Sequence, residues 1–221
     1  VLLLVYEAGD PVLTESKCNF WTFRFNGHMD MNVNVLTDYI AKQTDVRKVY
    51  LINQDYAFGQ SASRAAKELL SRKRPDIRIV GDDLVPLFKI KDFAPYVNKI
   101  RVSGADSVLT SNWGNDLSLL VKAGSESGLN VTYFTVIGAI PGTWATVGAA
   151  GGERVRSLDS WHVNAADSAW ESRLMGYKAR YKSNGNMDYL PPMRVVDMLA
   201  MAVNKSGSTD PVKVAYALEG M

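Results

Sequence analysis

The residues best suited to chemistry in this sequence follow short apolar runs. Three such segments are Asp55-Tyr56-Ala57-Phe58-Gly59, Ser111-Asn112-Trp113 and Gly138-Ala139-Ile140. Aromatic rings can cover an apolar body while amides and hydroxyls fix its orientation, so this mixture is typical of a small-molecule pocket. The rings of Phe58 and Trp113 could equally pack each loop against the helix behind it, and the pattern alone leaves both interpretations open.

Signatures of covalent or nucleotide chemistry are absent from the sequence. There is no Gly-x-Ser-x-Gly elbow, no phosphate loop ending in Gly-Lys-Ser or Gly-Lys-Thr, and no Gly-x-Gly-x-x-Gly fingerprint. The single cysteine, Cys18, cannot form an internal disulfide, and nothing places a histidine beside it, which favours an inert thiol over a nucleophile. His28 and Asp30 could share a metal, but two surface side chains are the simpler interpretation. We therefore expect no enzyme, no metal site and no cofactor.

Composition and charge exclude further classes of function. The 221 residues are 47% hydrophobic and 22% charged, which is ordinary for a globular protein. A formal net charge of +2 gives no strong field for a nucleic-acid backbone or an anionic membrane surface. No apolar run exceeds six residues, far fewer than the roughly 20 of a membrane helix, and the run at residues 1–6 has no basic stretch before it, so it predicts a strand and not a signal peptide.

Residues 47–138 repeat one pattern. Apolar runs at 49–52, 77–80, 107–110 and 131–137 alternate with segments whose apolar residues recur every three to four positions. Strands that alternate with helices of this length predict an α/β fold, with a parallel sheet and helices on both faces.

The residues on either side of this repeat predict a further, incomplete lobe. Residues 31–41 have a helical pattern, residues 154–163 a strand pattern, and three helical patterns follow, the last beginning at Asp210-Pro211. Helices without enough strands must pack on something else, which predicts two lobes: residues 1–25 with 162–221 as part of the first, and 26–161 as the second. The apolar start and the helical pattern close to the end lead us to expect a fragment of a longer protein.

Several local sequences resemble one protein family. They are Val49-Tyr50-Leu51-Ile52-Asn53-Gln54-Asp55-Tyr56-Ala57-Phe58-Gly59-Gln60, the Gly104-Ala105-Asp106 that precedes a strand, and the pair Phe23-Arg24. Together, and over essentially the whole chain, they resemble the type I periplasmic solute-binding proteins, in particular the branch that serves ABC importers of branched-chain amino-acid type.

The resemblance implies two Rossmann-like lobes that clamp a ligand in an interlobe cleft by hinge closure, here without the opening units of the first lobe and without a C-terminal tail. It implies ligand contacts at Phe58 and Trp113 and at the first-lobe loop Ala8-Gly9-Asp10, where the family's hydroxyl residues are replaced by Gly9 and Asp10. Tyr56, Asn112 and Ala139 lie in the same predicted loops and complete the expected ligand-binding set. We also expect the Trp113 ring to serve the cleft and not the core.

One departure from the family concerns the ligand. Amino-acid binders hold the ligand ammonium with an acid after the fourth strand of the second lobe, but this sequence has no Asp or Glu between Gly128 and Gly152. A desolvated ammonium without that counter-charge should bind several kcal/mol more weakly. Specificity for leucine, isoleucine or valine therefore does not follow from the resemblance.

The function expected from the sequence is that of a periplasmic solute-binding protein. It would capture a small organic solute, a carboxylate or an amino-acid-like molecule, and deliver it to the membrane permease of an ABC importer without inserting into the membrane or binding nucleic acid. Two alternatives stay open: a sensory ligand-binding domain of the same fold, and a small α/β enzyme with an unfamiliar site. A sensor should continue into a membrane helix or an output domain, and an enzyme should consume its ligand.

Overall fold

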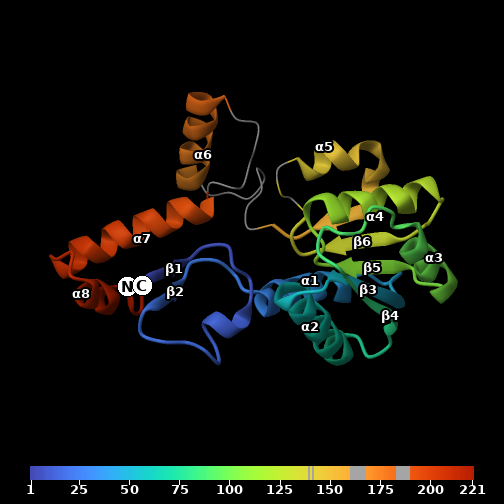
Figure 1. Cartoon of the computed structure of the whole chain (residues 1–221), viewed down its shortest axis with the longest axis horizontal. Helices are drawn as coiled ribbons and strands as arrows, with labels where there is room; N and C mark the ends of the chain where they lie inside the picture. Colours follow the sequence, from blue (N-terminus) through green and yellow to red (C-terminus); the bar gives the residue numbers. More distant parts are fainter. Residues whose placement is uncertain (139, 141, 160–167, 183–189) are drawn as a thin grey trace. The chain divides into compact units, whose positions relative to one another are not determined.

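The computed structural model describes residues 1–138, 140, 142–159, 168–182 and 190–221 (Figure 1). The chain divides into two compact units, Val1–His28 with Trp161–Met221, and Met29–Ser160. No helix in the described ranges is long and apolar enough to cross a membrane.

The larger unit alternates strands and helices, as the repeat at 47–138 predicts. Its elements are α1 (Met29–Ala41), β3 (Lys48–Gln54), α2 (Ala57–Lys73), β4 (Arg78–Val85), α3 (Ala94–Ser103), β5 (Ser107–Thr110), α4 (Gly114–Glu126), β6 (Thr132–Thr135), α5 (Thr143–Val147) and β7 (Val155–Ser157). The five strands are all parallel, in the order β4-β3-β5-β6-β7. The expected α/β class with a parallel sheet is confirmed.

Side-chain alternation along the strands builds two cores. Val49 and Leu51 of β3 pack with α1 and α2, whereas Tyr50 and Ile52 pack on the other face with α3 and α4. Successive residues of a strand point to opposite faces, so a continuous apolar run indicates a strand that is covered on both sides. Figure 1 shows the helices on the two faces of this sheet.

The strand order creates a switch point between β3 and β5. After β3 the chain enters α2, which contributes to the core on one face of the sheet, and after β5 it enters α4, which contributes to the core on the other face. In open parallel sheets a crevice forms outside the carboxyl ends of two such strands, because their loops leave in opposite directions. The edge beyond the ends of β3 and β5 is therefore a candidate site.

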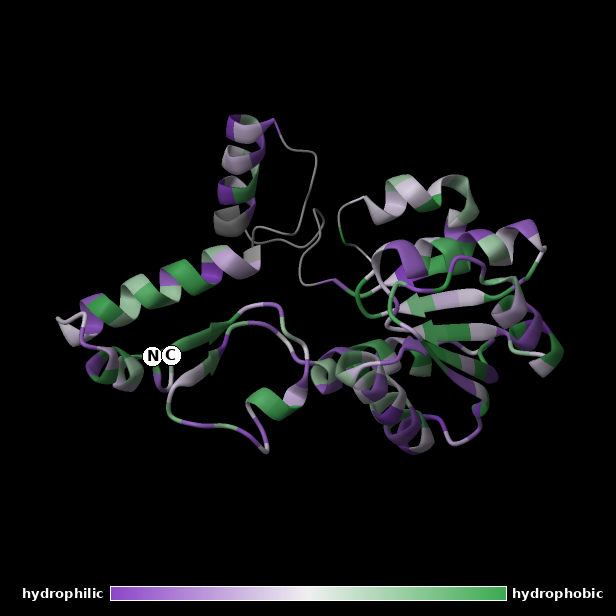
Figure 2. Ribbon diagram, in the orientation of Figure 1, coloured by the Kyte–Doolittle hydropathy of each residue, from purple (hydrophilic) through white to green (hydrophobic). Residues whose placement is uncertain are grey.

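The smaller unit has a two-stranded parallel sheet of β1 (Leu3–Val5) and β2 (Thr22–Arg24). Its helices are α6 (Ser168–Tyr181), α7 (Leu190–Ser206) and α8 (Pro211–Leu218), and Asp10 caps a short 3-10 turn at Pro11–Leu13. Ala202 of α7 and Val214 and Leu218 of α8 form a small core against which side chains of both strands pack. Figure 2 shows the apolar residues along β1, α7 and α8.

The start of α8 and the strand β2 can be compared with the sequence analysis. The capped helix start at Asp210-Pro211 is confirmed, because the Asp210 carboxylate accepts from the backbone N–H groups of Val212 and Lys213. The pair Phe23-Arg24, for which the sequence analysis expected no strand, lies in β2: it pairs with β1, and the Phe25 N–H donates to the Val5 carbonyl over 2.8 Å.

Candidate ligand site at the strand switch point

Two of the expected aromatic residues meet across the switch point. The indole N–H of Trp113, which follows β5, donates to the hydroxyl of Tyr56, which follows β3, over 3.0 Å. Desolvation raises the pKa of the Tyr56 hydroxyl, and the hydrogen bond from Trp113 opposes that effect. The hydroxyl therefore stays protonated at neutral pH and keeps its own O–H as a donor.

The Phe58 ring belongs mainly to the core. Its side chain is 9% exposed and joins the core cluster beneath α1 and α2, while its ring stacks on Tyr56 with centroids 5.8 Å apart. Trp113 also packs partly against this cluster. The expectation that the Trp113 ring does not serve the core is thus wrong, because the ring packs against the same cluster as Phe58, whereas its expected role in the cleft stays a prediction.

A third ring, missed by the sequence analysis, lies beside Trp113. Phe88, in the loop between β4 and α3, meets Trp113 edge to face with centroids 4.7 Å apart and an interplanar angle of 82°. Its residue is 47% exposed. Aromatic contacts therefore connect the loops that follow three neighbouring strands. Trp113 after β5 contacts both Tyr56 after β3 and Phe88 after β4.

A buried glycine, Gly59, lets α2 begin close against the end of β3. A Cβ atom on Gly59 would lie 2.0 Å from the backbone carbonyl oxygen of Gln54, at the end of β3. Only glycine permits this approach, so the Phe58-Gly59 pair marks a helix that begins against the strand it leaves.

Buried amides tie the loops together. Asn53, fully buried near the end of β3, accepts from both the N–H and the hydroxyl of Ser111 at 2.7 Å and donates to the Ser63 hydroxyl on α2 at 2.9 Å. One side chain thus links β3, the loop after β5 and the helix α2. An amide directly after an apolar strand run is the signal that could have identified it.

Three buried polar side chains at this edge keep unpaired atoms. Both amide atoms of Asn112, Oε1 of Gln54 and Oδ1 of Asp116 have no partner in the described part of the chain, although all three residues are fully buried. The other Asp116 oxygen accepts from Gln54 Nε2 at 2.8 Å and from the Phe88 N–H at 2.9 Å. Unpaired buried polar atoms are costly and tend to mark a place where another group binds.

The remaining expected site residues lie elsewhere. Gly9 and Asp10 belong to the smaller unit, where the Asp10 carboxylate accepts from the Val12 N–H at 3.1 Å. The Arg24 guanidinium donates to the carbonyls of Ala8 and Asp10 and to the Thr14 hydroxyl, so it holds this loop in place. Burial lowers the pKa of Arg24. Ala139 lies outside the described residues.

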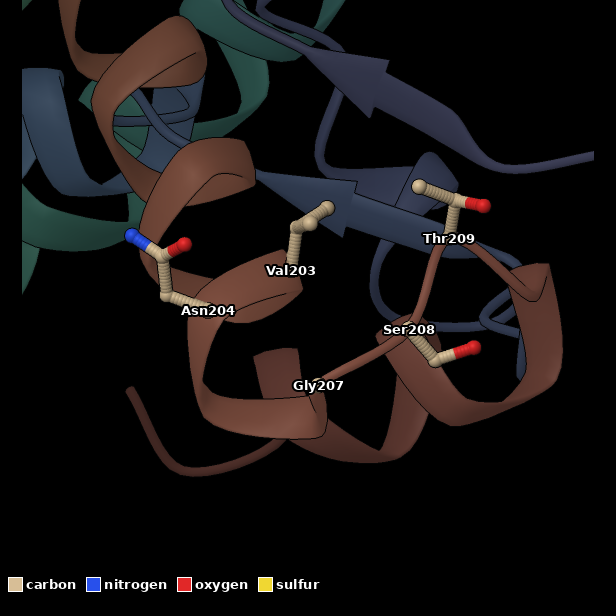
Figure 3. Close-up of a pocket in the computed structure, with 5 residues that line it drawn as sticks. All are labelled: Val203, Asn204, Gly207, Ser208 and Thr209. Carbon is tan, nitrogen blue, oxygen red and sulfur yellow. The ribbon is translucent and has the colours of Figure 1, made fainter.

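Other candidate features offer less chemistry. A shallow pocket at the turn between α7 and α8 is lined by Val203, Asn204, Gly207, Ser208 and Thr209 (Figure 3). Cys18 is exposed, His28 lies 3.6 Å from Glu15, and Asp30 pairs with Arg64. Among the residues that the structure describes, no three His, Cys, Asp or Glu side chains gather to hold a metal.

Comparison with known proteins agrees with this fold. A family model described as periplasmic binding protein matches residues 2–221. The Leu/Ile/Val-binding protein homolog 4 of Brucella abortus (strain 2308) is 34% identical over 150 residues, which is 67% of this chain and 36% of that protein.

Solved structures match the whole chain. The leucine-, isoleucine-, valine-, threonine- and alanine-binding protein of Brucella ovis, in a closed conformation, superposes with a TM-score of 0.82 at 26% identity and covers 98% of this chain and 56% of that one. An R. palustris ABC-transporter solute-binding protein in complex with benzoate gives 0.84 at 17% identity, covering 99% and 60%. The chain thus spans little more than half the length of these two solved proteins.

Proposed function

The chain belongs to the periplasmic binding protein family, and on that premise we propose that it forms part of an extracytoplasmic solute-binding subunit of an ABC importer. Its task is to capture a small organic solute and present it to a membrane permease, without covalent chemistry. The observation that carries the proposal is the hydrogen-bonded pair Tyr56 and Trp113 at the switch point. It brings two rings, and a hydroxyl proton with no acceptor among the described residues, to the edge where parallel sheets bind ligands.

We propose a small organic carboxylate as the ligand. The Tyr56 hydroxyl accepts from Trp113 and keeps its proton to donate, and a carboxylate oxygen is a strong acceptor for that proton. The buried Asn112 amide, which has no partner in the described residues, offers a second donor within the adjoining loop. The benzoate complex of the R. palustris protein supports a ligand of this class on the same fold.

A free amino acid fits these residues less well. The segment between Gly128 and Gly152 has no Asp or Glu to balance an ammonium group, and the acid at this edge, Asp116, is fully buried and already accepts from Gln54 and Phe88. An unbalanced ammonium that is taken out of water loses several kcal/mol of affinity. The names of the Brucella relatives describe amino-acid binders, so leucine is the appropriate competing ligand in a test.

Calorimetric titration of the natural full-length protein with benzoate and with leucine tests the proposal. We expect benzoate to bind more tightly than leucine, and mass spectrometry to recover the bound acid unchanged after long incubation. Tight leucine binding would overturn the ligand class. Steady conversion of the acid into a product would overturn the binding function itself.

A further inference from the structure

Phe88 adopts a backbone conformation that a bulky residue rarely takes. Its φ is 53°, and among the described non-glycine residues only Phe88 and Lys182 have a positive φ. This left-handed region brings Cβ close to the backbone, so it is disfavoured for phenylalanine and is kept only where surrounding contacts enforce it. Such residues gather at ligand-binding and catalytic sites.

A buried carboxylate enforces the conformation. The Phe88 N–H donates to Oδ2 of Asp116 at 2.9 Å, and the same oxygen accepts from Gln54 Nε2 at 2.8 Å. Asp116 is fully buried in the first turn of α4, where the helix dipole favours a negative charge. The strained residue is therefore anchored to the ends of two other elements, β3 and α4.

The Phe88 ring is not buried in the core. Phe88 is 47% exposed and its ring meets Trp113 edge to face at 4.7 Å. Gly114 lies on the same side of the ring, where a Cβ atom would be in ordinary van der Waals contact with Phe88 at 3.6 Å. A strained backbone that holds a half-exposed ring beside a second ring gains little from packing alone, which points to a further contact.

We propose that Phe88 and Trp113 form an aromatic corner that takes the flat apolar end of the solute. This proposal rests on the proposed function and names the orientation of the ligand within the same site. The carboxylate of the solute then points towards the Tyr56 hydroxyl, on the other side of the Trp113 indole N–H. Asp116 acts as a positioning residue through the Phe88 N–H.

The test compares Phe88→Gly with a matched control. Glycine accepts a positive φ, so Phe88→Gly should unfold at the same or higher denaturant concentration than wild type while its affinity for benzoate falls by about tenfold. Lys182→Gly relieves the same backbone strain in the smaller unit, and we expect it to stabilise the protein with unchanged affinity. Phe88→Tyr keeps the ring and should bind benzoate within about twofold of wild type.

Asp116 is tested by two substitutions. Asp116→Asn keeps an oxygen that can accept from the Phe88 N–H, whereas Asp116→Ala releases it. We expect the alanine variant to lose about tenfold in affinity and the asparagine variant to retain most of it. A loss of affinity that asparagine fails to rescue would show that Asp116 does not act by positioning Phe88.

The outcomes separate this proposal from the function on which it rests. If the natural full-length wild-type protein binds neither benzoate nor related acids, the proposed function fails and the aromatic corner fails with it. If wild type binds benzoate and Phe88→Gly binds it equally well, only the aromatic corner is overturned. A Phe88→Gly variant that is clearly less stable than wild type would assign the ring to packing and would also overturn it.

Discussion

The Trp113 indole and the Tyr56 hydroxyl are joined by a hydrogen bond of 3.0 Å, although 57 positions separate them in sequence. Tyr56 also stacks on the buried Phe58 ring, and Trp113 rests partly on the same core. Both side chains are therefore fixed without a ligand. Fixed contact residues lose little conformational freedom on binding, which favours affinity for a small solute.

Trp113→Ala should weaken binding of benzoate by roughly 1–3 kcal/mol, as expected for a buried aromatic anchor. Because the ring also packs on the core, we expect a lower denaturation midpoint as well. Trp113→Phe keeps a ring on the core and separates the two effects. Calorimetric titration and denaturant unfolding measure them, and an alanine variant with unchanged affinity would exclude Trp113 from the site.

Tyr56→Phe should lower the affinity for benzoate by roughly 1.5–3 kcal/mol, the usual contribution of a hydrogen bond to a charged group. The neutral analogue benzamide should lose less, because its acceptor carries no full charge. Desolvation raises the pKa of Tyr56, so the contact should persist as the pH approaches 10. Equal losses for the two ligands would contradict a carboxylate contact at Tyr56.

The repeat of strands and helices could be predicted because its signals are local. Runs such as Val49-Tyr50-Leu51-Ile52 have apolar residues on both faces, and α2 shows its apolar residues every three to four positions. The short helix α5 was missed, since it spans only five residues after Pro141-Gly142. The strand β2 was missed because three residues carry almost no periodicity.

The candidate site could be predicted only in part. Loops after parallel strands meet at one edge, so Tyr56, Asn112 and Trp113 could be grouped from sequence. The burial of Phe58 depends on how α2 begins against Gln54, and the pose of Phe88 depends on Asp116, 28 positions away. Contacts of that kind leave no periodic signal in the sequence. From the sequence, Asp116 in the first turn of α4 indicates only a favourable interaction with the helix dipole.

Gly59→Ala should destabilise the larger unit strongly, because the new methyl group would lie 2.0 Å from the backbone carbonyl oxygen of Gln54. We expect a loss of several kcal/mol, in the range of overpacked core positions. Gly176→Ala is the matched control: it lies within α6 with nothing within 4 Å of a new Cβ, so it should stabilise by roughly 0.5–1 kcal/mol. Denaturant unfolding measures both. A neutral Gly59→Ala variant would show that the start of α2 can shift away from β3.

Tyr133→Phe should leave the protein equally or more stable at pH 7, by up to about 1 kcal/mol, because the buried Tyr133 hydroxyl has no partner in the described residues. Tyr50→Phe should instead destabilise by about 1 kcal/mol, because the Tyr50 hydroxyl donates to the Asp83 carboxylate at 2.6 Å. The same Tyr→Phe substitution should therefore change the free energy of unfolding in opposite directions at these two positions of one sheet.

The alkaline response gives a second test of Tyr133. Desolvation raises its pKa to about 12, against the opposing effect of Arg154, whereas an unfolded chain titrates near 10. A raised folded-state pKa contributes stability that is fully present below pH 10 and is lost as the pH rises towards 12. Tyr133→Phe should therefore lose less stability than wild type between pH 10 and pH 12 in denaturant unfolding. If the two proteins lose stability in parallel over this interval, the Tyr133 hydroxyl is hydrated in the native state and its pKa is not raised by burial.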